Sequence, residues 1–371
     1  MTDPVHSVTS PVFTVGGERS PDLARDCIRL EITEGTDGLR TLKAELVAVG
    51  DGATGAGSDL RYLDGQILDF GKSVAVVAGP DGGQHLVFDG TVSGLEAVFG
   101  DGVPTTVMVY AEDAMMRLRM TRRSYTYTGV TDEDVARQIA DANGLKSELA
   151  AEGPEFAVVQ QVNQSDLAFL RERARRIQAE LWCEGQTLHF STRDKRKGTK
   201  LQLVRGDLLL SARLLADLAH QRSEVHVTGF DSATAAIIDE RADNEVVKQE
   251  SGKGRTGPQV VATALRPPQK DGQNPPKPWP LTFRFRDVAQ TGEQARAWAR
   301  AEMLRRARAF VSVEGVSRNT PELVVGSIVE LQDVGQPFSG DGYYVTRFCH
   351  TFDHTAGLRT RFTAERSTVN G

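Results

Sequence analysis

The feature that most constrains the fold of this chain is the alternation of apolar and polar residues between Pro11 and Glu112. Short alternating stretches are separated by glycine-bearing turns, as at Asp81–Gly83 and Gly100–Gly102. A period of two residues places successive side chains on opposite faces of a strand. The segment therefore predicts antiparallel strands joined by hairpins, in a β-barrel or β-sandwich.

The end of the chain repeats this pattern and contains a faint copy of the beginning. Asp89–Glu112 can be laid on Gly342–Glu365 without a gap by a shift of about 253 positions. Val92, Phe99, Ala111 and Glu112 then coincide with identical residues. Four identities in twenty-four are close to chance, but both ends of the chain can be interpreted as the same kind of β module.

Three segments have the 3.6-residue period of helices. Thr131 is the expected N-cap of a helix that Gly144 terminates, and Ser165 or Asn163 caps a helix with an apolar line from Leu167 to Leu181. A third helix is predicted at residues 291–310. Between the second and third helices, residues 250–280 are rich in Gly and Pro and predict an extended loop.

These elements predict a mainly β chain with an α+β insertion, in which a small helical and hairpin domain lies between two tandem β-barrel modules. The expected boundaries are residues 1–116 for the first barrel and 117–198 for the insertion. Residues 199–371 form the second barrel, which includes the loop at 250–280 and the helix at 291–310.

Composition excludes several classes of protein. A hydrophobic fraction of 39% in 371 residues can fill real cores, whereas a net charge of −6 argues against a protein that coats nucleic acid. The three cysteines, Cys27, Cys183 and Cys349, lack metal-ligand spacing and are expected to be buried thiols of a reducing compartment. No apolar run approaches the length of a membrane helix, and no export signal is visible at the N-terminus.

The sequence has no pattern specific to catalysis. Phosphate-binding glycine motifs and a nucleophile elbow are missing, and the loop at residues 50–60 lacks the carboxylate spacing of a calcium loop. His350 and His354 lie in strand-like sequence, where their rings would be about 13 Å apart rather than on one helix face. We therefore predict no enzyme activity and no catalytic, cofactor-binding or metal-binding residues.

Two groups of arginines allow three interpretations. Arg171, Arg173, Arg175 and Arg176 lie on the second predicted helix, and the third helix has a similar group. They could face solvent, contact another protein, or bind nucleic acid. Acidic residues interleave with the first group and the whole chain is acidic, which favours the first two. The second group is Arg300, Arg305, Arg306 and Arg308.

Five motifs in order resemble one family. They are the strand "DGTVSGLE", the strand and helix "FAVVQQVNQSDLAFLRERAR", the hairpin "LWCEGQTLHF", the strand pattern V-x-V-x-G-x-D from Val225, and the closing strands with "GYYV" and H-x-F. Together they are similar to the late control protein D and VgrG family, the hub of contractile phage tails and related injection machines. The helix of that family usually ends in glycine. Here Gln178-Ala179-Glu180 occupies the position, so we expect the helix to run a turn longer.

The resemblance implies a function for the chain. It implies a structural baseplate or tail hub protein, a homotrimer whose ring joins a sixfold tail tube to a threefold spike. Expected partners are an inner tube protein, other baseplate proteins and a separate spike protein, with no specific nucleic acid. The chain is expected to be made in the cytoplasm and assembled into a tail-like particle. The alternatives are a tail-associated enzyme that degrades cell walls and a nucleic-acid-binding protein with basic helices.

Overall fold

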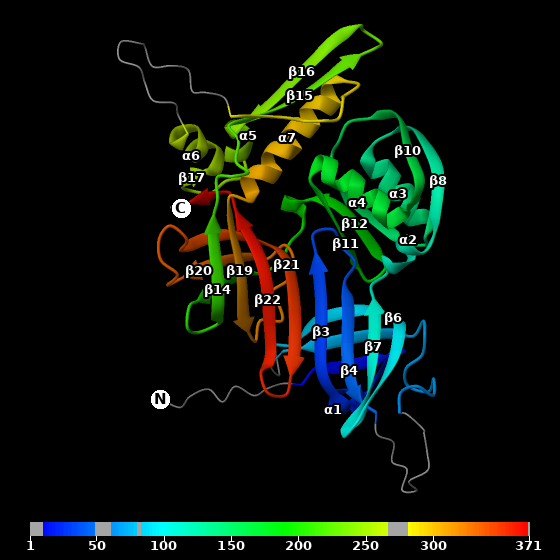
Figure 1. Ribbon diagram of the computed structural model, residues 1–371. Helices are drawn as coiled ribbons and strands as arrows, with labels where there is room; N and C mark the ends of the chain where they lie inside the picture. The colour runs from blue at the N-terminus through cyan, green and yellow to red at the C-terminus, as the bar shows by residue number, and fades with distance from the viewer. Residues whose placement is uncertain (1–9, 49–60, 80–82, 266–280, 370–371) are drawn as a thin grey trace, which may run out of the picture.

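The computed structural model describes residues 10–48, 61–79, 83–265 and 281–369, and the chain is mainly β, as predicted (Figure 1). The expected loop at residues 50–60 and the turn at Asp81 lie outside the described residues. None of the described helices is long and apolar enough to cross a membrane. The helices are α1 (Pro21–Asp26), α2 (Met116–Met120), α3 (Asp132–Ala142), α4 (Asp166–Ile177), α5 (Asn244–Lys248), α6 (Gly257–Ala264), α7 (Gly292–Arg308) and the 3-10 turn η1 (Arg193–Lys195).

The largest sheet among the described residues has 13 strands and consists of two halves. The first half, here called module A, contains five strands in the order β3-β4-β7-β6-β5. All four neighbouring pairs are antiparallel. A further strand, β1 (Val12–Val15), pairs with β5, and the short β2 (Glu18–Arg19) pairs with β1. The strands of module A are β3 (Cys27–Gly35), β4 (Thr41–Val47), β5 (Ser73–Ala78), β6 (His85–Gly100) and β7 (Val103–Glu112).

The second half, module B, has five strands in the equivalent order β14-β19-β22-β21-β20, again with antiparallel neighbours. It differs from module A in its outer strand, because β13 (Lys200–Val204) runs parallel to β20. The strands of module B are β14 (Leu209–Ala216), β19 (Val311–Arg318), β20 (Ile328–Gln332), β21 (Gly340–Asp353) and β22 (Gly357–Arg366).

The registers of the two modules agree along their central hairpins as far as Val98 and Thr351, after which only the β6–β7 hairpin has a further register shift. Val92 lies opposite Ala111 in module A, and Val345 lies opposite Ala364 in module B. In both hairpins the register then shifts by one residue at the same position, between Val92 and Gly94 and between Val345 and Arg347. This is the pairing that the 253-position shift in the sequence requires.

The agreement extends to the outer strands of the modules. The pair Cys27–Leu46 in β3 and β4 corresponds to Leu209–Ser317 in β14 and β19, and a register shift follows at the same place in both. Ser73 opposite Thr91 corresponds to Ile328 opposite Tyr344. Five strands with shared order, direction and register make the two modules structural repeats.

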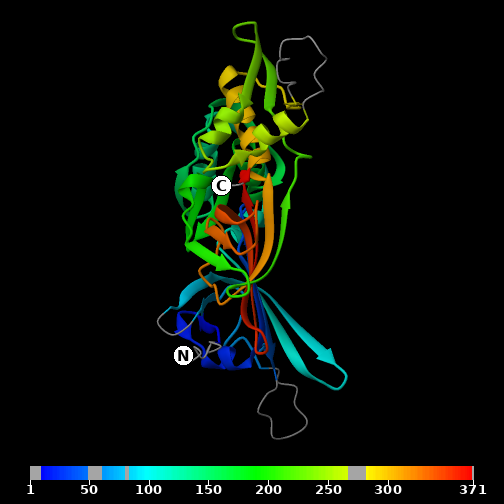
Figure 2. The same ribbon diagram turned by 90° about the vertical axis from the view of Figure 1, so that its left-hand side faces the viewer.

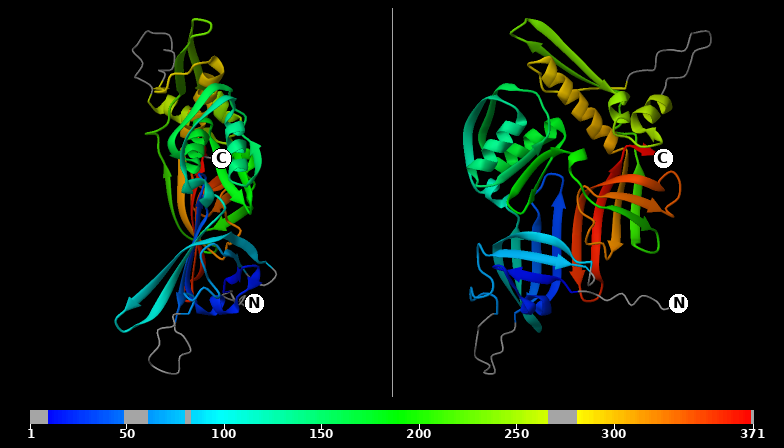
Figure 3. Two further views of the ribbon diagram at one scale, coloured as in Figure 1. Left: turned by 90° about the vertical axis from the view of Figure 1, so that its right-hand side faces the viewer. Right: turned by 180° about the vertical axis from the view of Figure 1, so that it is seen from behind.

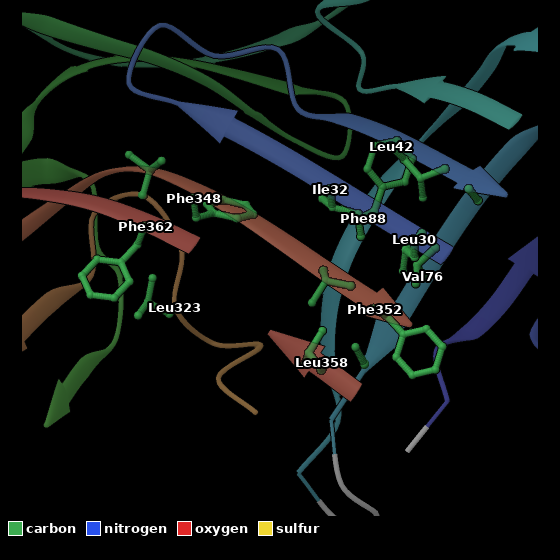
Figure 4. Packing of buried hydrophobic residues seen from close by; sticks show 14 of the residues in the cluster. Leu30, Ile32, Leu42, Val76, Phe88, Leu323, Phe348, Phe352, Leu358 and Phe362 are labelled. Atoms are coloured by element: carbon green, nitrogen blue, oxygen red, sulfur yellow. The ribbon is translucent and has the colours of Figure 1, made fainter. Parts of the chain in front are cut away.

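The two modules are joined by antiparallel pairing of β21 with β3, so that one continuous sheet crosses the molecule (Figures 1 and 3). One hydrophobic cluster fills the space beneath both modules. Figure 4 shows side chains of this cluster at the junction, where Phe348 and Phe352 of module B lie near Leu30 and Ile32 of module A.

The insertion and the helix α7 form a second hydrophobic cluster above the sheet (Figure 1). In the insertion, α3 and α4 pack beside a two-stranded and a three-stranded sheet, and α7 packs on the hairpin of β15 and β16. This hairpin projects from the top of the molecule (Figure 2). The strands of this region are β8 (Arg122–Val130), β9 (Lys146–Ala150), β10 (Phe156–Ser165), β11 (Ala179–Glu184), β12 (Thr187–Thr192), β15 (Glu224–Asp231), β16 (Ala236–Asp243) and β18 (Thr282–Arg284).

Three expectations need correction. No sheet in the described part of the chain closes into a barrel, because β21 pairs with β3 and merges the two expected barrels into one sheet. Residues 250–280 are not simply a loop, since they contain β17 (Arg255–Thr256), which pairs with β23 (Thr368–Val369), and α6. Residues 266–280 lie outside the described residues.

The helix α4 is the third correction, because it does not run a turn longer. It begins at the predicted N-cap Ser165 and ends at Ile177, and Gln178 adopts the left-handed conformation with φ of 56°. Glycine is usual at such a position, because residues with a side chain rarely adopt the left-handed conformation. Gln178 therefore ends the helix in a conformation that is unfavourable for a residue with a Cβ atom.

A buried ionic network lies where module A, module B and the insertion meet. Arg40 and Arg196 both donate to the Glu34 carboxylate, and Arg196 also lies 3.5 Å from Glu180. The Tyr344 hydroxyl donates to Glu180 at 2.8 Å. Burial alone would raise the pKa of Glu34, but the two guanidinium groups hold it below its ordinary value.

We expect Glu34→Ala to lower the free energy of unfolding by about 3–5 kcal/mol, because Arg196 would be left buried without its closest carboxylate. Glu31→Ala, three positions earlier on the same strand, is the control and should change stability by less than about 0.5 kcal/mol. Urea unfolding followed by circular dichroism measures both. Equal effects of the two substitutions would contradict a special role for the network.

Candidate assembly interface

Part of β6 forms an unpaired sheet edge. The first half of β6 pairs with β5, but from Gly94 to Gly100 only β7 pairs with it among the described residues. Val98 is 41% and Phe99 is 70% exposed on this edge. The segment contains no proline and a single charge, so nothing of the usual kind prevents another strand from pairing with it.

A second unpaired edge lies on β14, the terminal strand of the sheet in module B. This strand pairs with β19 on one side, and on the other side no described strand pairs with it. Leu210 and Leu215 are 42% and 48% exposed. The sheet therefore has two unpaired edges of similar length with exposed apolar side chains, one on its terminal strand β14 and one on the part of β6 that extends beyond β5.

The chain already contains one junction between the equivalents of these two edges. Under the correspondence of the modules, β21 is the equivalent of β6 and β3 is the equivalent of β14. Arg347–Asp353 of β21 pair with Arg29–Gly35 of β3. Phe352, the equivalent of Phe99, is 1% exposed in this junction. The same residue at the same register is thus buried where a neighbouring strand is present and exposed where none is.

The arginines of α4 do not form one free basic face, because Arg175 is exposed as expected whereas Arg173 is not. Arg173 is buried, pairs with Asp132 and lies over the Phe156 ring. Burial raises the pKa of Asp132, although Arg173 opposes this effect. Arg171 donates to the backbone carbonyl oxygens of Asp37 and Gly38, which tie the insertion to module A.

The remaining α4 arginines are more exposed. Arg176 lies near Glu172 and Asp287, with its guanidinium over the Trp298 ring. Arg175 donates to the carbonyl oxygen of Arg171 one turn earlier. Most of the cationic surface that the sequence suggested is therefore used within the chain.

The arginines of α7 are likewise paired within the chain. Arg306 is buried, donates to Glu302 at 2.7 Å and lies over the Phe283 ring. Arg308 donates to both oxygens of Glu250. The other two predicted members also have partners, Arg300 with Gln249 and Arg305 with Glu302.

A cavity of about 800 Å³ lies between one end of module B and the segment after α5. Four carboxylates line it. Glu365 pairs with Arg193, Glu250 with Arg308 and Asp194 with Lys195, whereas Asp341 accepts a hydrogen bond from the backbone N–H of Gly342. A glycoside-cleaving pair needs one carboxyl group that keeps its proton and one that is free to act as a nucleophile or base. Glu250 and Glu365 do not fit those roles, because both pair with arginine.

His350 and His354, the two histidines four residues apart in the sequence, lie in different environments. His350 is buried, with Nδ1 2.8 Å from the Thr360 hydroxyl, whereas His354 is exposed at the strand end. Within the described residues, no three His, Cys, Asp or Glu side chains are grouped to hold a metal ion. Cys27 and Cys183 are buried as predicted, and Cys349 is partly exposed.

The two edges are not predictable from strand patterns alone, although one signal in the sequence points to them. The faint repeat matched Phe99 with Phe352, and a strand residue this apolar is expected to be covered in both copies of a module. The structure shows that the neighbouring strand β3 covers Phe352, whereas no described strand covers Phe99.

The chain was compared with protein families and with curated proteins. The family model described as "Alg8 N-terminal domain" matches residues 13–354. No curated protein matches the chain significantly.

Solved structures of tail proteins share the fold over almost the whole chain. The 43 kDa tail protein of prophage MuSo2 from Shewanella oneidensis is 16% identical, with 96% of this chain and 98% of that chain covered and a TM-score of 0.64. The tail protein from Neisseria meningitidis MC58 is 13% identical, with 96% of each chain covered and a TM-score of 0.60.

A secretion-system protein shares the fold as well. An Escherichia coli component of the type VI secretion system is 12% identical, with 95% of this chain and 76% of that chain covered and a TM-score of 0.55. That protein is described as structurally similar to two tail proteins of bacteriophage T4.

The junction between β21 and β3 should be sensitive to pH through His350. Burial, with a smaller effect from Arg40, lowers the pKa of His350 to about 3. An unfolded histidine has a pKa near 6.5, so between about pH 6.5 and 3 only the unfolded state binds the proton and stability falls as the pH falls. At pH 5 the expected loss is about 2 kcal/mol relative to pH 7.

Urea unfolding at pH 7 and pH 5 checks this expectation. His350→Gln should remove much of the difference between the two values, whereas His354→Gln, at the exposed end of the strand, should leave it unchanged. The same pH dependence in both variants would show that other groups cause it.

Proposed function

The chain belongs to the family described as the Alg8 N-terminal domain. From the fold, which it shares with phage tail proteins, we propose that it is a structural hub protein of a contractile tail or contractile injection system. In this proposal it forms a homotrimeric ring. The ring joins a sixfold tail tube to a threefold spike.

The observation that carries the proposal is the duplicated module. Each chain has two repeats of five strands with the same order and register. Three chains would therefore present six nearly equivalent modules around one axis. Such a ring could match a sixfold tube on one face while its three insertions keep threefold symmetry on the other.

In the hub role, the symmetry and shape of the ring determine which proteins the chain contacts. The modules would contact an inner tube protein, and the insertions or the α7 region would contact a separate spike protein and other baseplate proteins. The chain would be made in the cytoplasm and carried in the particle.

The alternatives have less support. A cell-wall-degrading enzyme would need a pair of free carboxylates in a cavity, whereas three of the four carboxylates that line the cavity pair with basic residues. A nucleic-acid-binding protein would need free cations, whereas Arg173, Arg306 and Arg308 are paired and buried. A role in assembly requires neither.

The first test is the mass of the particle in solution. We expect light scattering after size-exclusion chromatography to give three times the chain mass of 40.4 kDa at micromolar concentration. Class averages from negative-stain electron microscopy should show a ring with a central opening and six similar densities. A monomer or a dimer at every concentration up to the solubility limit would contradict the hub proposal.

The second test separates the alternative functions. The purified chain is expected to release no soluble fragments from peptidoglycan and to cause no salt-sensitive retardation of double-stranded DNA. Turnover that Glu250→Gln or Glu365→Gln abolishes would favour the enzyme. Retardation that weakens steeply with salt would favour the nucleic-acid-binding protein.

A further inference from the structure

We propose that the free edge of β6 in one copy of the chain pairs with the free edge of β14 in the next copy, and that this pairing repeats the β21–β3 junction found inside each chain. The inference rests on the proposed ring and specifies how its subunits join. It follows from the described pairings, because each edge is the structural equivalent of a strand that is already paired.

The module correspondence fixes the register of the proposed junction. Inside the chain, Thr351 lies opposite Glu31. Val98 is the equivalent of Thr351, and Arg213 is the equivalent of Glu31, so Val98 should lie opposite Arg213 of the next copy. The strands would be antiparallel. The flanking pairs are Leu95 with Ala216, Glu96 with Leu215, Ala97 with Leu214, Phe99 with Ala212 and Gly100 with Ser211.

The side chains on the core side of this junction are compatible with it. Phe348, His350 and Phe352 face the core of the in-chain junction and are buried. Their equivalents on β6 are Leu95, Ala97 and Phe99, which are apolar. Their proposed partners on β14 are Ala212, Leu214 and Ala216. Every one of these six positions is apolar, as a strand edge that becomes buried requires.

The outer side of the junction is compatible as well. In the proposed register, Glu96 of one copy lies diagonally across from Arg213 of the next, within reach of a long side chain. Arg213 forms no ion pair or side-chain hydrogen bond with another described residue, whereas Glu96 accepts a hydrogen bond from Tyr110. Opposite charges in this place favour the register and oppose pairing of two copies of the same edge.

The arrangement determines the symmetry type. Each copy offers two different edges, one in module A and one in module B, so the interface is heterologous and each copy binds two neighbours. Such an interface gives a closed ring if the rotation between copies closes, and a filament if it does not. If the in-chain and inter-chain junctions are equivalent, three chains supply six similar junctions. Six similar junctions around one axis favour a closed ring over a filament.

Cysteine cross-linking tests the register. In a Cys349→Ser background, Val98→Cys and Arg213→Cys are combined in one chain and oxidised with copper phenanthroline. Residues directly opposite in antiparallel strands have Cα atoms about 4.5–5.5 Å apart, within the range that a disulfide spans. We expect covalent dimers and trimers on a non-reducing gel, with the trimer as the largest product.

Matched controls make the result specific. Val98→Cys with Leu215→Cys moves one partner by two residues on the same face and should give at least tenfold less product. Val98→Cys alone should give no dimer, whereas a mixture with a chain carrying Arg213→Cys alone should give dimers and nothing larger. Dimers from Val98→Cys alone would indicate pairing of like edges and overturn the proposal.

The outcomes distinguish the junction from the ring. A particle of three chains without the Val98–Arg213 cross-link would overturn the proposed junction and leave the hub function standing. A monomer that does not cross-link would contradict both. A ladder of products beyond three chains would support the junction and contradict the closed ring.

An interface substitution gives an independent measurement. Phe99→Asp should leave the folded monomer intact, because Phe99 is 70% exposed, and should reduce the trimer fraction at least tenfold in light scattering. Phe230→Asp, at a 53% exposed phenylalanine of the projecting β15–β16 hairpin, is the matched control and should leave the trimer unchanged. A Phe99→Asp variant that folds and keeps the trimer would overturn the proposed junction.

Discussion

The pairing of β21 with β3 is the contact on which the rest of the structure depends. It joins two repeated modules into one sheet and fixes their relative orientation through a ladder of backbone hydrogen bonds. It also allows one hydrophobic cluster to extend beneath both modules, with Ile32 and Phe352 completely or almost completely buried. Each module by itself would be a small sheet with two exposed edges, whereas the joined sheet leaves only its outer edges open.

The charges buried beside this junction act mainly on orientation. Glu34, Arg196 and Glu180 lose hydration when they are buried, and their mutual attraction offsets that loss only in good geometry. Replacing such a network with apolar side chains often leaves stability unchanged, so net stabilisation is a weak explanation for it. The network instead connects β3, β11 and the segment after η1, and we infer that it favours one placement of the insertion over the sheet.

The sequence predicted those parts of the fold that local chemistry determines. Thr131 and Ser165 cap α3 and α4 as expected, because a hydroxyl before an apolar repeat satisfies free backbone N–H groups. The repeat between the two ends of the chain was visible in four identities. Strand pairing between distant segments was not predictable in this way, since alternation shows that a residue lies in a strand but does not name its neighbour.

The same limit explains the errors about the site. A count of arginines gives charge but not partners, so the pairing of Arg173 with Asp132 across the insertion was invisible. Closed barrels were expected because short alternating strands joined by glycine turns are typical of barrels, whereas β21 pairs with the other module. Gln178 was expected to extend α4, but the sharp return into β11 requires a left-handed residue there and overrides its local preference.

The differences between the two modules are those that an in-chain and an inter-chain junction would need. The in-chain junction forms during folding of a single chain, so it can bury large side chains such as Phe348 and His350 without exposing them to other molecules. An edge that waits for another copy must remain soluble, and long apolar edges promote aggregation. The equivalent positions on β6 are the smaller Leu95 and Ala97, with Glu96 between them. The same strand arrangement can thus form the junction within a chain and the proposed junction between chains. The two differ in side-chain size and charge, because one is covered during folding and the other only during assembly.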